Sequence, residues 1–383
     1  MKRILFLVLF NMVFLVADGQ VKVRFELLDM PKATEVKPAY FVAGNFNSWS
    51  PNDANSQLVK TTGSYVLEKS LPLGNYEFKI TRGDWSKVES ASSGQAIANR
   101  SFTLKKDTLI RLNVAAWADA FKKEAPQSTA TTNVHLLDSA FEMPQLHNKR
   151  SIWIYLPPSY AKSKQKYPVL YMHDGQNVFD QSTAGFGEWG VDEILDSLIA
   201  KGAQEYIVVA VANGGSERLK EYNLYDSQYG KGKGKAYVAF LAETLKPYID
   251  QHYRTLRDSK HTAIAGSSMG GLISMYAMAA YPNVYGKAGI FSPAFWLGKA
   301  IETDIKNAGV ALKGHQVYLV AGALEGTMMT RDMESVYQVL LGTEKEQLLK
   351  AGKDVKLVEK ADGKHREWFW RREFPAFYEF IAN

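Results

Sequence analysis

The sequence predicts two folded parts: a small all-β sandwich, followed by an α/β unit whose mostly parallel sheet is covered by helices. Three observations predict this. Short strand-like runs punctuated by Gly and Pro fill residues 20–116. From residue 133 onward, strand-like and helix-like runs alternate. In this second part, the glycine-flanked serine Ser268 separates a buried strand-like run from a helix-like run.

Length and composition restrict the possible classes of protein. A chain of 383 residues is expected to form about two domains, and 46% hydrophobic with 22% charged residues is typical of a folded protein. The net charge of +6 is spread along the chain without a basic and aromatic array, so we expect no nucleic-acid partner. Because there are no cysteines, disulfides, thiolate metal sites and a catalytic thiol are excluded. We expect no metal and no cofactor.

Residues 1–19 have the pattern of a secretory signal peptide. Lys2 and Arg3 precede an apolar run over residues 4–16, and the small residues Ala17 and Gly19 stand before a predicted cleavage site. The alternatives are a buried strand or an anchor helix. The pattern predicts a secreted or periplasmic protein without a lipid anchor, and no later stretch is apolar enough for a membrane span.

The first part, residues 20–116, is predicted to be the sandwich. Trp49 and Trp85 are its candidates for stacking on a sugar ring. The alternative is that Trp49 packs into its own turn and that the sandwich is a structural accessory. Residues 117–132, rich in Ala, Lys, Ser and Thr, are predicted to be a linker. The predicted strands of the sandwich cover residues 21–28, 39–43, 64–68, 75–80 and 108–114.

The second part, residues 133–383, is predicted to hold its active site at the carboxyl ends of its parallel strands. The predicted strands are 151–156, 167–172, 206–212, 262–265, 287–292, 315–321 and 355–359. The predicted helices are 191–201, 236–253, 272–280, 331–350 and 374–382.

Ser268 is predicted to be a nucleophile because it lies in Gly266-Ser-Ser-Met-Gly270, a G-x-S-x-G nucleophile elbow. A sharp, strained turn exposes the serine hydroxyl, and only very small residues fit two positions away on either side. The alternative is an ordinary strand-to-helix turn. The readable strand before it and helix after it favour the catalytic interpretation.

A nucleophilic serine needs a base and an acid that orients it. His365 lies in a polar loop after the last predicted strand, at the correct end of the sheet, whereas His315 lies at the wrong end. We therefore predict His365 as general base. For the acid, Glu325 follows the strand that ends at residue 321 and is favoured over Asp332, which remains the alternative.

Two backbone N–H groups should stabilise the oxyanion. Met269, directly after the nucleophile, supplies one. Gln176 or Gly175, in the loop after residues 167–172, supplies the other, since glycine permits a close backbone approach. His173 and Asp174 are interpreted as residues that hold the shape of this loop.

Five motifs in order make the second part resemble the putative-esterase family of α/β hydrolases. This family includes enterochelin esterase, S-formylglutathione hydrolase, mycolyltransferases, and the feruloyl and acetylxylan esterases of the first carbohydrate-esterase family. One departure concerns the acid, because many members carry an aspartate where Glu325 is predicted. The motifs are Met172–Asn177, Gly187–Asp192, residues 213–222, Ala265–Gly271 and Ser292–Trp296.

The first part also carries a resemblance. Residues 42–51 and 74–79 are similar to the immunoglobulin-like sandwiches, of the glycogen-binding-module kind, that precede starch- and glycogen-active enzymes. Some members of that group bind glucan through exposed tryptophans, and many are packing modules. The resemblances together imply an α/β-hydrolase fold preceded by an immunoglobulin-like sandwich.

The implied function is an exported serine carboxylic-ester hydrolase with a Ser-His-Glu triad, which removes feruloyl or acetyl groups from plant polysaccharide. The partner would be an acylated polysaccharide or oligosaccharide. The alternatives are a catecholate-siderophore esterase and a non-catalytic carbohydrate-binding protein. Aromatic and polar residues are expected at the rim of the substrate pocket: Trp189, Arg218, Glu221, Tyr222, Trp296 and Trp368.

Overall fold

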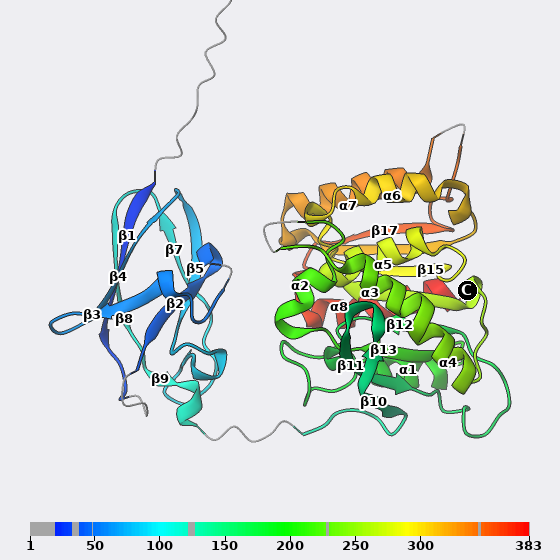
Figure 1. Ribbon diagram of the computed structural model, residues 1–383, viewed down its shortest axis with the longest axis horizontal. Coiled ribbons are helices and arrows are strands. Elements are labelled where there is room, and N and C mark those ends of the chain that lie inside the picture. Colours follow the sequence, from blue (N-terminus) through cyan, green and yellow to red (C-terminus); the bar gives the residue numbers. More distant parts are fainter. Residues whose placement is uncertain are drawn as a thin grey trace, which may run out of the picture. The chain divides into compact units, whose positions relative to one another are not determined.

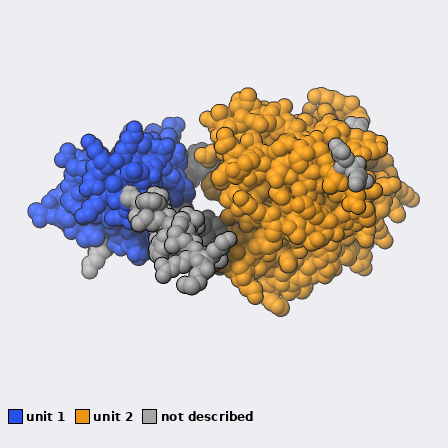
Figure 2. Space-filling view, turned by 90° about the horizontal axis from the view of Figure 1, so that it is seen from above, with its two compact units in different colours: residues 1–125 blue, residues 126–383 orange. Residues whose placement is uncertain are grey.

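The computed structural model describes residues 20–32, 38–47, 49–121, 127–226, 230–343 and 346–382, so the predicted signal peptide lies outside the described residues. The chain divides into two compact units, Met1–Ala125 and Pro126–Asn383, which Figures 1 and 2 show. In the described ranges, no helix is both long and apolar enough to cross a bilayer.

The first unit is built on one seven-stranded sheet that folds over on itself. Phe25 of β1 and Phe78 of β5 contact edge to face with ring centroids 5.2 Å apart, although four pairings separate their strands in the sheet. The sheet order is β7-β5-β2-β3-β4-β1-β8. The strands are β1 (Val21–Asp29), β2 (Tyr40–Gly44), β3 (Gln57–Lys60), β4 (Tyr65–Leu71), β5 (Gly74–Thr81), β7 (Arg100–Leu104) and β8 (Thr108–Asn113).

The alternating pattern of β1 explains this core, because its buried residues Val23, Phe25 and Leu27 point to one face. Two short strands, β6 (Glu89–Ser90) and β9 (Ala116–Trp117), form a separate ribbon. Strands β3 and β7 were not among the predicted strands. The likeness of this unit to immunoglobulin-like modules stays a prediction.

The second unit contains a mixed eight-stranded sheet in the order β10-β11-β13-β12-β14-β15-β16-β17. The strands from β13 to β17 pair in parallel, whereas β10 and β11 form an antiparallel edge. An α/β fold with a mostly parallel sheet is therefore present. The bounds are β10 (Val134–Met143), β11 (Asn148–Tyr155), β12 (Val169–Met172), β13 (Ile207–Val211), β14 (Thr262–Ser267), β15 (Lys287–Phe291), β16 (Gln316–Gly322) and β17 (Val355–Lys360).

Helices cover both faces of this sheet (Figure 1). One face packs against α1 (Val191–Ala200) and α8 (Glu367–Ala382). The other face packs against α3 (Gly234–Ala239), a π-helical turn (Phe240–Leu245), α4 (Lys246–His252), α5 (Met269–Ala280), α6 (Ile301–Ala308) and α7 (Thr327–Leu341). The short α2 (Arg218–Glu221) follows β13.

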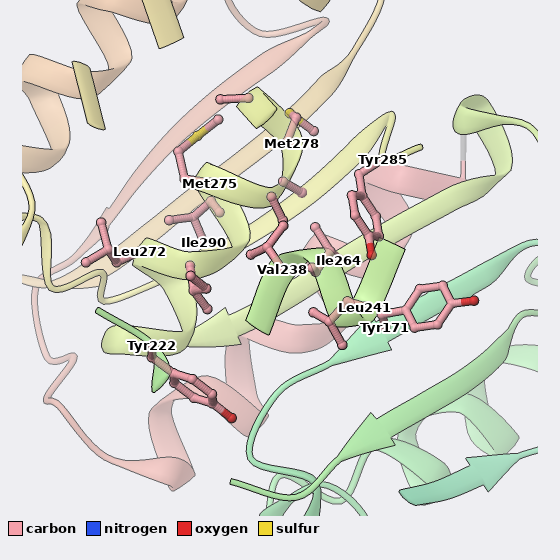
Figure 3. Packing of buried hydrophobic residues seen from close by; sticks show 14 of the residues in the cluster. Tyr171, Tyr222, Val238, Leu241, Ile264, Leu272, Met275, Met278, Tyr285 and Ile290 are labelled. Carbon is pink, nitrogen blue, oxygen red and sulfur yellow. The ribbon is translucent and has the colours of Figure 1, made fainter. Parts of the chain in front are cut away.

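Neighbouring strand residues pack on opposite faces. Ile264 lies in the core with α3 and α5, while Ala263 and Ala265 lie in the core with α1 and α8. Figure 3 shows Ile264 and Ile290 among the side chains of the first of these cores. Because both faces are apolar, polar chemistry is left to the loops at the strand ends.

Two helix predictions need correction, and one further helix was missed. The predicted helix 331–350 runs from Thr327 to Leu341, because Gly326 and Gly342 bound it with φ values of 97° and 79°. The last helix begins at Glu367, not at residue 374. Helix α6 was not predicted; its eight residues bury only Ile301 and Ile305.

The end of the predicted linker is bound to the second unit. In this segment, residues 128–133, here called the strap, Ser128 Oγ donates to Asp180 and Thr129 Oγ1 donates to Glu188, both at 2.7 Å. The backbone N–H of Thr131 donates to Asp192 at 2.7 Å, and the Asn133 amide donates to Asp196 at 2.9 Å. Four carboxylates of the second unit therefore accept hydrogen bonds from the strap.

We predict that a chain starting at residue 127 is more stable than one starting at residue 134. The shorter chain loses the four strap donors and leaves the buried Asp192 without Thr131. At about 1 kcal/mol for each hydrogen bond, the loss should lower Tm by on the order of 10 °C. Thermal unfolding of both chains measures this. Equal Tm values would show that the strap contributes nothing to stability.

Candidate active site

Ser268 lies at a strained turn between β14 and α5. Its φ of 58° and ψ of −119° are unusual for a residue with a side chain. Backbone hydrogen bonds hold the turn, from Ser268 N to Phe291 O at 2.9 Å and from Ala294 N to Ser268 O at 3.0 Å. A Cβ on Gly266 would lie 2.8 Å from the His173 ring, so this position has room only for glycine. The predicted elbow geometry is thus present.

His365 and Glu325 meet at the carboxyl ends of β17 and β16. The His365 Nδ1 lies 2.7 Å from Glu325 Oε2. The glutamate side chain is buried, while the histidine side chain is partly exposed. A carboxylate at Nδ1 holds the proton on that nitrogen, so Nε2 is the atom that can accept a proton. His365 also lines the same cavity as Ser268.

Glu325 is oriented by the Ser292 hydroxyl, which Trp370 holds in turn, and by the Gly322 N–H, none of which was predicted. The Ser292 hydroxyl donates to Glu325 Oε1 at 2.7 Å and accepts a hydrogen bond from Trp370 Nε1 at 2.9 Å. The backbone N–H of Gly322 donates to the same carboxylate oxygen at 2.8 Å. The sequence did carry one signal for Ser292, because this residue begins one of the motifs on which the family resemblance rests. It carried no signal that Trp370, and not Trp368, would contact the site.

Asp332, the alternative acid, lies on α7. Its carboxylate contacts Arg331 at 3.2 Å and is not among the residues that line the cavity of Ser268. Among the described residues, the geometry therefore supports Glu325 as the partner of His365.

The predicted oxyanion donors lie at two chain segments beside Ser268. Met269 is the first residue of α5, and the first N–H groups of a helix have no partner within the helix. Gln176 lines the cavity, and its side chain accepts a hydrogen bond from Asn213 N at 3.1 Å. A Cβ on Gly175 would lie 2.8 Å from the β13 backbone, which explains the glycine. This placement supports both segments as donors.

His173 and Asp174 shape the loop that carries Gln176. His173 Nδ1 lies 2.9 Å from the Tyr237 hydroxyl, and burial lowers the pKa of His173 to about 4, so the ring is neutral. Arg218 donates to both oxygens of Asp174 at 2.6 and 2.7 Å. Although burial acts to raise it, the charge and hydrogen bonds of Arg218 bring the pKa of Asp174 below its ordinary value.

The cavity has a volume of about 560 Å³. Besides Ser268 and His365, its walls include aromatic residues and side-chain amides, namely Phe186, Trp189, Trp370, Asn177 and Asn213. Of the predicted rim residues, Trp189 and Arg218 line it. Phe186, Asn213 and Trp370 were not predicted.

Four predicted rim residues do not line this cavity. Glu221 is buried in an ion pair with Arg150, and Tyr222 is buried below the loop, where its hydroxyl accepts a hydrogen bond from Asp174 N. Trp296 and Trp368 are 40% and 46% exposed and lie outside the cavity lining. Trp368 instead packs near the Arg372 guanidinium. In the structure, two of these residues are therefore buried beneath the loop, and two are exposed outside the lining of this cavity.

Comparisons with known proteins identify a family and similar folds. The family model described as Putative esterase matches residues 144–381. An endo-1,4-β-xylanase/feruloyl esterase of Xylanibacter ruminicola is 29% identical over 153 residues, 39% of this chain and 20% of that protein. A solved ferulic acid esterase has a TM-score of 0.51 at 22% identity, covering 65% of this chain and 98% of that chain. The solved enterobactin esterase of Shigella flexneri has a TM-score of 0.54 at 16% identity, and the match covers 96% of this chain and 94% of that chain.

We predict that a fluorophosphonate reagent labels Ser268. The hydroxyl is activated only if His365 can accept its proton, so Ser268→Ala should abolish labelling and His365→Ala should slow it by on the order of 10³-fold or more. Mass spectrometry of the labelled peptide measures this. Ser335→Ala, at an exposed serine of α7, is the control and should label normally. Labelling that survives Ser268→Ala would contradict the assignment.

We predict that Glu325→Gln lowers the turnover of 4-nitrophenyl acetate by about 10²- to 10⁴-fold, with a much smaller change in KM. The amide keeps an acceptor for Gly322 N and Ser292 but presents the wrong group to His365. Asp332→Asn is the matched control and should retain nearly full turnover. The reverse order of effects would make Asp332 the acid.

Proposed function

Because the chain belongs to the putative esterase family, we propose that it is a serine carboxylesterase with Ser268, His365 and Glu325 as its triad. The observation that carries this proposal is the hydrogen bond between His365 Nδ1 and Glu325, made where His365 lines the same cavity as the strained Ser268. Each of the three groups lies in a loop or turn that follows a strand of the parallel sheet.

The proposed reaction has two halves. In the first half, Ser268 Oγ attacks the ester carbonyl while His365 Nε2 takes the hydroxyl proton, and Glu325 stabilises the imidazolium that forms. The N–H groups of Met269 and of Gln176 or Gly175 bind the oxyanion. The alcohol then leaves with the proton from His365. In the second half, water attacks the acyl-serine by the same route and releases the acid.

For the substrate, we propose feruloyl or acetyl esters of plant polysaccharide, hydrolysed outside the cytoplasm after removal of residues 1–19. The aromatic walls, Phe186, Trp189 and Trp370, suit a phenolic acyl group. Support comes from the relative named xylanase/feruloyl esterase and from the likeness to a ferulic acid esterase fold. A polysaccharide cannot enter a cell intact, which agrees with the predicted export.

A catecholate-siderophore esterase is the second candidate, because the fold comparison with an enterobactin esterase extends over both units. The charge of the cavity favours the first candidate. Arg218 is the one guanidinium among the described lining residues, and Asp174 already neutralises it. A polyanionic ferric catecholate would find no unpaired cation there. A purely binding role would leave the strain at Ser268 without a use.

We propose that the first unit is a module of the carbohydrate-binding kind. Trp49 and Trp85 lie with ring centroids 6.3 Å apart and planes tilted by 42°, and Trp85 is 40% exposed. Two neighbouring indole rings support the stacking of sugar rings. The alternative is that the unit is only a structural accessory. In that case, removal of the first unit would leave the binding of insoluble polysaccharide unchanged.

A substrate panel tests the proposed function. We expect methyl ferulate or acetylated xylan to be hydrolysed at least tenfold faster, in kcat/KM, than a cyclic catecholate-serine lactone. We expect Ser268→Ala to lose on the order of 10⁴-fold with each ester. A preference for the lactone would establish the second candidate. Absence of any Ser268-dependent hydrolysis would overturn the proposal.

A further inference from the structure

Glu367 is a largely buried residue that lines the cavity, and the proposed mechanism does not use its carboxyl group. It is the first residue of α8, is 9% exposed and lines the same cavity as Ser268 and His365. Among the described residues, no other side chain or backbone group forms a hydrogen bond or ion pair with its carboxyl. The carboxyl oxygens are not fully buried, so a ligand in the cavity can reach them.

The charged groups near Glu367 come from three segments. His365 and Arg366 precede it in the chain, and the Asp174–Arg218 pair belongs to the loop and helix across the cavity. The loop before α1 also contacts Glu367, since a Cβ added to Gly187 would lie 3.5 Å from the Glu367 Cβ. Burial, assisted by the charge of Asp174, raises the pKa of Glu367, against the opposing effects of its own N–H, Arg366 and His365.

The neighbouring polar side chains of the cavity are already occupied within the protein. The Asn213 amide donates to Asp174, and the Asn177 side-chain oxygen accepts from Gly185 N. The Gln176 side-chain oxygen accepts from Asn213 N, and the Thr183 hydroxyl donates to Gln176 O. Glu367 differs from these groups because its acceptor oxygens have not been used to hold a loop.

We propose that Glu367 is a specificity-determining residue whose carboxyl accepts a hydrogen bond from a hydroxyl group of the bound ester. This inference rests on the proposed function and makes it narrower: the preferred substrates are uncharged esters that carry a hydroxyl. The hydroxyl can belong to a phenolic acyl group or to the sugar that bears the ester. A carboxylate at this place also disfavours anionic substrates, because like charges repel.

The expected effect is large enough to measure. A site built to hydrogen-bond a substrate hydroxyl discriminates against the analogue that lacks it, because the buried acceptor is then left without a partner. For one hydrogen bond to a charged group we expect about 10- to 100-fold in kcat/KM, mainly through KM.

The experiment compares matched esters on the wild type, Glu367→Gln and Glu367→Leu. Methyl ferulate against methyl 3,4-dimethoxycinnamate tests a phenolic hydroxyl, and acetylated xylobiose against its fully O-methylated counterpart tests a sugar hydroxyl. In each case the measured quantity is the ratio of kcat/KM within the pair. We expect Glu367→Leu to lower at least one ratio by about 10- to 100-fold and Glu367→Gln to lower it less, since an amide oxygen still accepts. Glu359→Gln, an exposed carboxylate of β17, is the matched control.

Binding to inactive protein separates this inference from the proposed function. In the Ser268→Ala protein, calorimetry with the same esters should show a loss of affinity when Glu367→Leu is added, whether or not the wild type hydrolyses them. If the kcat/KM ratio and the affinity change only for the phenolic pair, the hydroxyl that Glu367 binds belongs to the acyl group. If they change only for the sugar pair, it belongs to the alcohol part of the ester. Both outcomes support the proposal. Unchanged ratios and affinities in folded variants overturn it.

Discussion

The buried carboxylate of Glu325 connects the three strand-end loops on which the site depends. One of its oxygens accepts from Gly322 N, after β16, and from Ser292, after β15, while the other contacts His365, after β17. Trp370 of α8 completes this chain through Ser292. The imidazole is therefore oriented by groups from four elements, each fixed by the core beneath it. This arrangement supports a preorganised base, because little rearrangement is needed when the proton moves.

The packing of the sheet explains why the site lies where it does. Both faces of the parallel strands are covered by apolar helices, so backbone and polar side chains can gather only beyond the strand ends. Close approach of these loops requires glycine at particular places. A Cβ on Gly322 would lie 2.1 Å from the Gly363 backbone, which means that the loops carrying Glu325 and His365 could not meet with larger residues there.

The parts of the site that the sequence predicted are those tied to strand ends. Ser268, Glu325 and His365 follow recognisable strands, and the topology then brings them to one edge. The rim residues were harder to predict, because the direction of a loop side chain leaves no periodic signal and because residues 367–373 were not predicted to be helical. Trp368 and Trp370 illustrate this: two residues apart on α8, they are rotated by about 200°, so only Trp370 lines the cavity. The hydrogen bonds of the strap left no signal in the sequence either, since its polar composition resembles a free linker while its donors bind carboxylates.

The charges around the cavity serve the scaffold more than the substrate. Asp174 pairs with Arg218, Glu221 with Arg150 and Glu188 with Arg371, and each pair holds a loop or helix in place. Glu188 also accepts from Thr129 of the strap, so the loop before α1 is held from two sides. Of the two carboxylates among the described lining residues, Asp174 is thus neutralised by Arg218, and only Glu367 has no basic partner. Such a site is suited to an uncharged ester whose negative charge appears only in the transition state.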